Sequence, residues 1–122
     1  FIRDVRKDLD EPSLPFVIAV LGVGGTDDQA EGKIAFKKMQ SAAGEMPEFK
    51  DNVAIVQTDQ FWDKTAEAVF RKGWKQNLEE WQTVGSDYPF HYLGSPSTYS
   101  DIGRAMAEAL IELQRGTAHS SN

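Results

Sequence analysis

The sequence of 122 residues contains no cysteine, no long apolar run and no excess of basic residues. Without cysteine, no disulfide can stabilise the fold and no thiol can serve as a nucleophile or a metal ligand. The longest apolar run, Phe16 to Leu21, is far shorter than the roughly 20 residues that a membrane-spanning helix needs. With 19 acidic and 13 basic residues, the net charge of −6 repels a phosphate backbone. We therefore expect neither nucleic acid nor a membrane as a partner.

What the sequence does contain is typical of one folded, water-soluble domain or a piece of one. Hydrophobic residues make up 40% of the chain and charged residues 26%, close to the averages of globular proteins. The closest approach to a basic cluster, formed by Arg3, Arg6 and Lys7, is typical of a solvated helix face. We expect one folded unit over residues 1–116 and a flexible tail over residues 117–122.

Two short apolar segments are predicted to be strands of a parallel sheet. Phe16 to Leu21 is apolar throughout, as a parallel strand covered on both faces must be. Val53 to Val56 is a second segment of strand length, rich in β-branched residues. Between them lie a glycine-rich turn, Gly22 to Gly25, and a helix that the polar residues 26–28 are expected to cap. The residues of this helix predicted to point inward are Ala30, Ile34, Ala35 and Met39.

Three further helices are predicted from apolar spacing. One covers the first residues of the chain, and a second covers residues 64–84, interrupted only by Gly73. A third begins at Ser95-Pro96, where serine can cap the helix and proline fits its first turn, and is expected to end at Gly116. Its predicted inward face consists of Tyr99, Ile102, Met106, Leu110 and Leu113.

Together these segments predict an α/β fold with a parallel sheet of two strands and about four helices. Sheets of this kind usually contain about four to six strands. The chain also opens on a helical pattern, with no methionine before it. We therefore expect further strands of the same sheet before Phe1, so that the chain forms the C-terminal portion of a larger domain.

His91 is the candidate catalytic residue. It lies in a loop of aromatic residues just before the last helix, and Asp87 is the carboxylate close to it in sequence. A neutral imidazole can accept a proton from a hydroxyl and return it to a leaving group when a carboxylate or carbonyl holds its other nitrogen. On this pattern alone, a histidine that only packs among Tyr88, Phe90 and Tyr92 and hydrogen-bonds the backbone is the favoured interpretation.

Two other segments are candidate binding sites. The glycine turn after the first strand fits neither common phosphate-binding motif, and the acidic residues that follow it repel phosphate, so a tight turn is the favoured interpretation. Residues 59–63 join acidic and aromatic side chains after the second strand, where they can contact a sugar. Asp63-Lys64 is also an ordinary helix start. No histidine, aspartate and glutamate cluster has metal-ligand spacing, and we expect neither a metal nor a cofactor.

Four stretches taken together resemble one family, in an order and spacing that cover most of the chain. They are LPFVI at residues 14–18 running to Gly22, PEFKDNVA at residues 47–54, TDQFW at residues 58–62, and FHYLGS at residues 90–95. This set resembles the sialate O-acetylesterase-like branch of the SGNH hydrolases, which includes acetylxylan esterases. The resemblance maps onto the C-terminal half of the catalytic domain and implies a three-layer α/β/α sandwich, similar to flavodoxin in its layers.

The resemblance implies an enzyme that removes O-acetyl groups from carbohydrate. His91 matches the family's histidine, whereas the nucleophilic serine and the oxyanion donors have no counterpart and are expected before Phe1. Asp87 stands four residues before His91, where many relatives have aspartate three residues before, so a Ser-His pair without Asp87 stays an alternative. Phe90, Tyr92, Phe61 and Trp62 are candidates for lining the substrate. We expect the chain by itself to be inactive, and an extracellular or periplasmic location follows only from the relatives.

Two alternatives to the esterase remain. In one, the aromatic loop around Phe90 and the pair Phe61-Trp62 hold a glycan or a protein partner without cleaving it. In the other, the turn at Gly22 to Gly25 binds the phosphate of a mononucleotide in a flavodoxin-like module.

Overall fold

The computed structural model of the chain describes residues 1–86 and 88–119, with side chains up to residue 116. It is a mixed α/β structure with a parallel sheet of two strands, β1 (Phe16–Val20) and β2 (Val53–Gln57). The register places Phe16 opposite Val53 and Val20 opposite Gln57. Both predicted strands and their parallel pairing are confirmed. The sandwich of three full layers that the resemblance implies stays a prediction.

Five α-helices and four short 3-10 turns accompany the sheet in the described part of the chain. The α-helices are α1 (Ile2–Asp8), α2 (Glu31–Ser41), α3 (Lys64–Arg71), α4 (Leu78–Val84) and α5 (Pro96–His119). The 3-10 turns are η1 (Ala42–Glu45), η2 (Pro47–Phe49), η3 (Thr58–Phe61) and η4 (Tyr92–Gly94).

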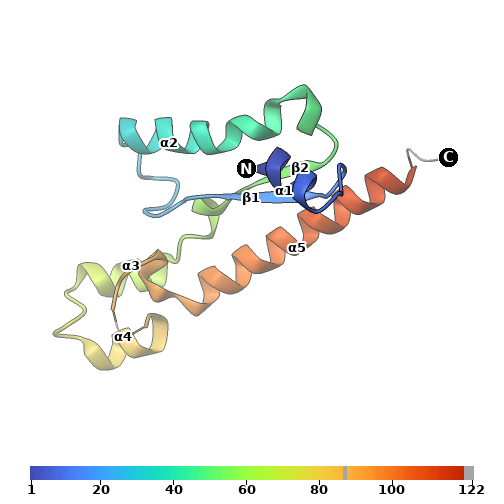
Figure 1. Cartoon of the computed structure of the whole chain (residues 1–122). Coiled ribbons are helices and arrows are strands. Elements are labelled where there is room, and N and C mark those ends of the chain that lie inside the picture. Colours follow the sequence, from blue (N-terminus) through green and yellow to red (C-terminus); the bar gives the residue numbers. More distant parts are fainter. Residues whose placement is uncertain (87, 120–122) are drawn as a thin grey trace.

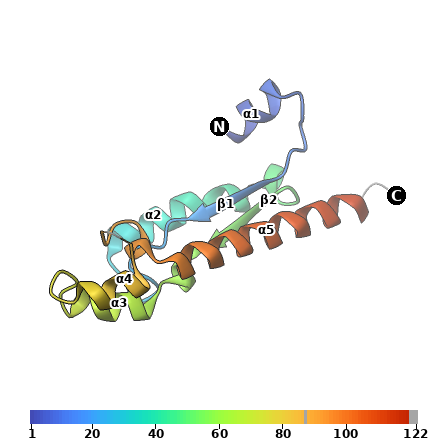
Figure 2. The ribbon, with the colours of Figure 1, turned by 90° about the horizontal axis from the view of Figure 1, so that it is seen from below.

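Helices α2 and α5 lie on opposite faces of the sheet, and α3 and α4 lie beyond the carboxyl ends of its strands (Figure 1). The view from below, in which α5 is in front, shows the same order and places α1 out to the side of β1 (Figure 2). Four of the predicted inward residues of α5, Ile102, Met106, Leu110 and Leu113, are half-buried, and α5 contacts both strands. Tyr99 is about half exposed. The predicted start of α5 is confirmed.

The long helix predicted over residues 64–84 is wrong, because the segment folds into two helices. Gly73 has a φ of +95°, in the left-handed region that glycine adopts without strain and where a helix commonly ends. Residues 73–77 then turn the chain back, and Asn77 Nδ2 donates to the Gly73 carbonyl at 3.0 Å. This reversal brings the rings of Trp74 and Trp81 to a centroid distance of 5.8 Å. The apolar spacing continues through the turn because both helices pack on one cluster.

The predicted inward face of α2 is also wrong. Ile34 and Met39 are 46% and 63% exposed, and none of the residues in α2 is fully buried. The helix approaches the sheet through polar side chains instead: Lys37 pairs with Asp59, and Gln40 Oε1 accepts from the Leu21 N–H at 2.9 Å. The helix begins after Ala30 without a side-chain cap, so the expected cap within residues 26–28 is wrong as well.

Two expectations at the chain ends need correction. Arg6 is buried rather than solvated, since its guanidinium donates to the Leu14 carbonyl at 2.7 Å and to Asn52 Oδ1 at 2.8 Å. These bonds hold α1 against the amino ends of both strands. At the other end, α5 continues through Gly116 to His119, so the predicted cap at Gly116 is wrong. Glycine ends a helix where it takes a positive φ, and Gly116 does not.

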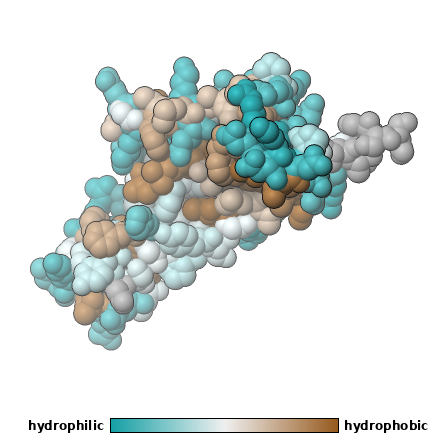
Figure 3. Space-filling model, viewed as in Figure 1, coloured by the Kyte–Doolittle hydropathy of each residue, from teal (hydrophilic) through white to brown (hydrophobic). Residues whose placement is uncertain are grey.

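The fully buried apolar residues lie mainly at the carboxyl end of the sheet and below it. One cluster joins α3, α4 and η4 through Ala66, Val69, Trp81 and Leu93. Strand β1, by contrast, is fully buried only at Val20. Hydrophobic residues gather on the visible surface between the layers of α2 and α5, where β1 runs (Figure 3). The edge of β1 that faces away from β2 has no strand beside it in the described residues.

Candidate functional site

His91 lies on an unusual stretch of backbone between α4 and α5. Its φ is +44°, and Tyr92, Leu93 and Gly94 follow at +58°, +59° and +62°. A left-handed conformation costs each non-glycine residue on the order of 1–3 kcal/mol, so it persists only where surrounding contacts impose it. The His91 side chain is exposed, whereas Tyr92 and Leu93 are buried. The segment therefore presents the imidazole outward and anchors itself with the next two side chains.

The first anchor is the Tyr92 hydroxyl, which lies between the ends of the two strands. It accepts from the Gly22 N–H at 2.7 Å, just after β1, and it is hydrogen-bonded to Thr58 Oγ1, just after β2. Thr58 Oγ1 in turn donates to the Val20 carbonyl at 2.6 Å. All of these groups are buried. The residue after His91 is thus fixed to the carboxyl ends of both strands, where open α/β sheets place their sites.

Glycine at position 22 makes this anchor possible. A Cβ atom there would lie 2.0 Å from the backbone nitrogen of Asp59 and 2.4 Å from its Cα. Rigid backbone atoms cannot give way at such distances, so any side chain at residue 22 would push the ends of β1 and β2 apart. The glycine turn therefore reflects close packing. Its Gly22 N–H is directed to Tyr92 rather than to a ligand.

The second anchor holds the backbone of His91 itself. The Tyr99 hydroxyl, from the first turns of α5, donates to the His91 carbonyl at 2.7 Å. The Gly94 N–H also donates to this carbonyl, at 3.2 Å. Gly94 is needed at its position, because a Cβ atom there would lie 2.0 Å from Ser86 Oγ. The His91 peptide is therefore held from the helix that follows it as well as from within the turn.

The third anchor joins two helix caps. Asp63 Oδ1 accepts from the N–H groups of Thr65 and Ala66 at 2.9 and 3.0 Å, which confirms the predicted start of α3. Asp63 Oδ2 accepts from Ser95 Oγ at 2.6 Å, and Ser95 Oγ itself accepts from the Thr98 N–H at 3.3 Å at the start of α5. One carboxylate thus ties α3 to α5. This bond fixes the end of the His91 segment to the loop that follows β2.

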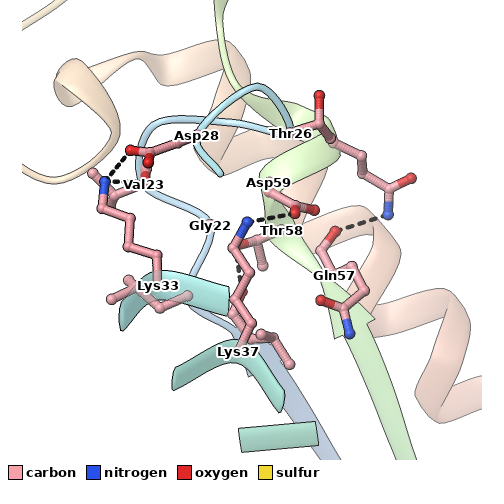
Figure 4. A network of polar contacts seen from close by, with 12 residues as sticks. Gly22, Val23, Thr26, Asp28, Lys33, Lys37, Gln57, Thr58 and Asp59 are labelled. Atoms are coloured by element: carbon pink, nitrogen blue, oxygen red, sulfur yellow. Dashed lines mark hydrogen bonds and ion pairs between the residues drawn. The ribbon is translucent and has the colours of Figure 1, made fainter. Parts of the chain in front are cut away.

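Three lysine–aspartate pairs surround the loops at this end of the sheet. Lys37 reaches from α2 to Asp59, and Lys33 points at Asp28 (Figure 4). Lys64 Nζ pairs with Asp27 at 2.6 Å, which links the glycine turn to α3. Hydrogen bonds from Lys64 and Lys33 lower the pKa values of Asp27 and Asp28, respectively. The acidic residues after the glycine turn are therefore engaged as structural ion pairs.

The predicted substrate-lining residues divide into exposed and packed ones. Phe90 is 67% exposed and stacks on Tyr88 at a centroid distance of 5.8 Å; Tyr88 also meets the ring of Trp74 edge-on. Tyr92 is buried by its anchor, and Phe61 and Trp62 are half-buried. Trp62 packs against the cluster of α3 and α4 and donates to Glu67 Oε2 at 3.0 Å. Of the four, Phe90 is the one whose ring is open to solvent beside His91.

Asp87, the predicted partner of the His91 ring, lies outside the described residues, and its role stays a prediction. The sequence singled out His91 as a candidate but did not indicate that Tyr92, Thr58 and Tyr99 anchor its segment. The only sequence feature that pointed to a role for Thr58 was its position directly after the second strand. Tyr92 was assigned to substrate lining because its ring type suggested a surface role, whereas its hydroxyl is part of the buried framework.

Other candidate sites can be placed as well. Within the described residues, no three histidine, aspartate and glutamate side chains are arranged to hold a metal ion, and none of the helices is long and apolar enough to cross a membrane. A groove with a volume of about 900 Å³ lies at the opposite, amino end of the sheet. Leu14, Ala54 and Leu113 line it together with the acidic residues Glu11 and Glu112. His91 is not part of this groove.

The chain was compared with protein-family models, with curated proteins and with solved structures, and none of them matches it. The geometry around His91 and the resemblance of the sequence motifs are therefore the features that bear on function.

Proposed function

We propose that this chain supplies the acid–base histidine of an esterase that removes O-acetyl groups from carbohydrate. In this proposal the serine nucleophile and the oxyanion donors come from a part of the protein that precedes Phe1. The completed domain would be the three-layer α/β/α sandwich of SGNH-type hydrolases, with the chain supplying two of its strands.

The observation that carries the proposal is the exposed imidazole of His91 on a strained and anchored segment. A histidine that only fills the core would be buried, and a histidine on an ordinary surface loop would not need a run of left-handed residues held by buried hydrogen bonds. An acid–base group must be accessible to substrate and held in one geometry. The exposed side chain of His91 and the hydrogen bonds that hold its backbone at the carboxyl end of a parallel sheet support this role.

The proposed reaction uses His91 as base and then as acid. The serine oxygen attacks the acetyl carbonyl while the His91 imidazole accepts the serine proton. The imidazolium then donates that proton to the sugar oxygen as the ester C–O bond breaks, which leaves an acetyl-serine. In the second half, His91 accepts a proton from water, which attacks the acetyl group. Acetate leaves, and the proton returns to the serine oxygen.

The edge of β1 that faces away from β2 supports the proposal that another strand of the same protein pairs with β1. The Phe16 N–H donates to the Asn52 carbonyl, on the side of β2. Because backbone groups alternate along a strand, Val17 and Ala19 direct theirs to the other edge. That edge is apolar and lies between the layers of α2 and α5 (Figure 3). A further parallel strand there would move β1 from the edge to the interior of the sheet, where an unbroken apolar strand is typical.

The test is acetate release by the full-length gene product from p-nitrophenyl acetate and from acetylated xylan. His91→Ala should lower kcat/KM by about three orders of magnitude or more, as removal of a triad member does. His119→Ala, which removes the other histidine of the chain, should leave the rate unchanged. Equal activity of His91→Ala and the unaltered protein would contradict the assignment of His91.

A second candidate, binding of a glycan without cleavage, is favoured by the exposed Tyr88–Phe90 stack. Flat aromatic faces open to solvent are suited to sugar rings. If the full-length protein releases no acetate, this candidate predicts that the protein still binds acetylated xylan. Replacing Phe90 with alanine would then weaken that binding, measured by calorimetry, whereas His91→Ala would not.

A further inference from the structure

Tyr92 belongs to a hydrogen-bond chain whose direction can be assigned from its end. The Thr58 hydroxyl has one proton, and it donates that proton to the Val20 carbonyl at 2.6 Å. The bond between Thr58 Oγ1 and the Tyr92 hydroxyl must then use the tyrosine proton. The Tyr92 oxygen in turn accepts from the Gly22 N–H at 2.7 Å. The series of hydrogen bonds therefore runs from Gly22 through Tyr92 and Thr58 to Val20, with each proton used once.

These hydrogen bonds connect Tyr92, the residue adjacent to His91, to the ends of the two strands. The Tyr92 ring is buried, with ring centroids of Trp62 and Tyr99 at 6.3 and 6.0 Å. His91 points to solvent and Tyr92 points into the framework, so the tyrosine sets where the imidazole stands relative to the ends of β1 and β2. The packing of the ring could be kept by phenylalanine, but the hydrogen bonds could not.

We propose that Tyr92 and Thr58 are positioning residues for His91, which they hold in the left-handed conformation needed for proton transfer. This inference rests on the proposed function for its catalytic consequence. Loss of the Tyr92 hydroxyl leaves the Gly22 N–H and Thr58 Oγ1 without their buried partner. The segment can then relax toward ordinary backbone angles, and the imidazole moves with it. Neither residue touches the substrate in this role.

The first experiment uses the chain itself and does not depend on esterase activity. Amide hydrogen exchange of Gly22 is measured by NMR in the unaltered chain, in Tyr92→Phe and in Thr58→Val. Because the Gly22 N–H donates to the Tyr92 hydroxyl, Tyr92→Phe should speed its exchange by about tenfold or more. The control is Tyr88→Phe, a change to an exposed tyrosine of the same loop, which should not alter the rate. Exchange at the unaltered rate in Tyr92→Phe would overturn the proposal.

The second experiment measures esterase kinetics in the full-length gene product. Tyr92→Phe and Thr58→Val should each lower kcat by about tenfold to a hundredfold, in line with a displacement of about 1 Å, while KM stays within about twofold. Val53→Ala, at the opposite end of β2, provides a control that lowers Tm without touching the chain of hydrogen bonds. A fall in kcat for Val53→Ala equal to that for Tyr92→Phe would reduce Tyr92 to a purely structural role.

The two experiments separate failure of this inference from failure of the proposed function. If the unaltered full-length protein releases no acetate but Tyr92→Phe speeds Gly22 exchange, the esterase proposal fails and the anchor stands. If acetate is released but neither Gly22 exchange nor kcat responds to Tyr92→Phe, the esterase proposal stands and the positioning role is wrong.

Discussion

The carboxyl end of the sheet and the face formed by helix α2 and the free edge of β1 lie in very different surroundings. At the carboxyl end of the sheet, polar side chains such as Thr58, Ser95 and Thr98 are at most 2% exposed, and each has a hydrogen-bond partner. Along α2 and the free edge of β1, apolar side chains stay open, including Phe36 and Met39 on the helix. Buried polar groups are costly without partners, so their concentration at one end indicates where geometry is most closely specified.

At the carboxyl end of the sheet, buried hydrogen bonds specify one arrangement of the side chains. Along α2 and the free edge of β1, apolar side chains stay exposed to solvent. In the described residues, no buried side-chain nitrogen or oxygen is left without a hydrogen-bond partner. The strained His91 segment therefore stands on a fully satisfied framework. The open apolar surface is consistent with the proposal that another part of the protein completes the sheet beside β1.

The largest expected effect comes from the core beneath the His91 segment. Trp81 is fully buried in the cluster that includes Leu93, and Trp81→Ala should reduce the free energy of unfolding by about 3–5 kcal/mol because it leaves a large cavity. Met39→Ala, on the open face of α2, should change it by less than about 0.5 kcal/mol. Urea denaturation measures both. Equal losses would mean that the contrast between the two regions is wrong.

A smaller effect is expected from two glycines that differ only in their surroundings. Gly22→Ala should destabilise the chain by about 1–3 kcal/mol, because the added Cβ meets the Asp59 backbone. Gly32→Ala should stabilise it by about 0.5–1 kcal/mol, since Gly32 lies in α2 with no atom near its missing Cβ and alanine favours helix. Thermal unfolding of the two variants decides the comparison, and a stabilised Gly22→Ala variant would contradict the close approach of the strand ends.

The smallest effect concerns pH. The pKa of Glu67 lies below its ordinary value of 4.5, chiefly because Arg71 hydrogen-bonds its carboxylate and Trp62 adds a second bond. Its stabilising contribution is therefore complete above the ordinary value and is lost as pH falls through the lowered one. Glu67→Gln should cost about 0.5–1 kcal/mol at pH 7, and the difference should shrink as the pH is lowered below 4.5.

The matched variant for this measurement is Glu48→Gln. Arg3 also lowers the pKa of Glu48, but both side chains are largely exposed. Added salt should therefore weaken the Glu48 contribution more than that of Glu67, whose side chain is 16% exposed. Urea denaturation at low and high salt gives the two differences. A pH-independent cost of Glu67→Gln would show that the ion pair is not its source.

The strands and the start of α5 were predictable because their signals are local. Unbroken apolar runs and the Ser95-Pro96 pair act through neighbouring residues, and the structure confirms what they predict. The turn at Gly73 and the outward face of α2 were missed for a different reason. Apolar spacing continues through Gly73 although the chain reverses there, and the face of α2 that meets the sheet is set by Lys37 and Gln40, which look like surface residues in sequence.

The two strands, the net negative charge and the candidacy of His91 could be inferred before folding is considered, since they depend on local pattern and on the chemistry of single side chains. The way in which His91 is held depends on contacts between distant residues. The Tyr92 hydroxyl meets Gly22 and Thr58 across 70 and 34 positions of sequence, and Ser95 meets Asp63 across 32. Such contacts exist only after the strands have paired and the helices have packed, because folding alone brings these distant groups within hydrogen-bonding distance.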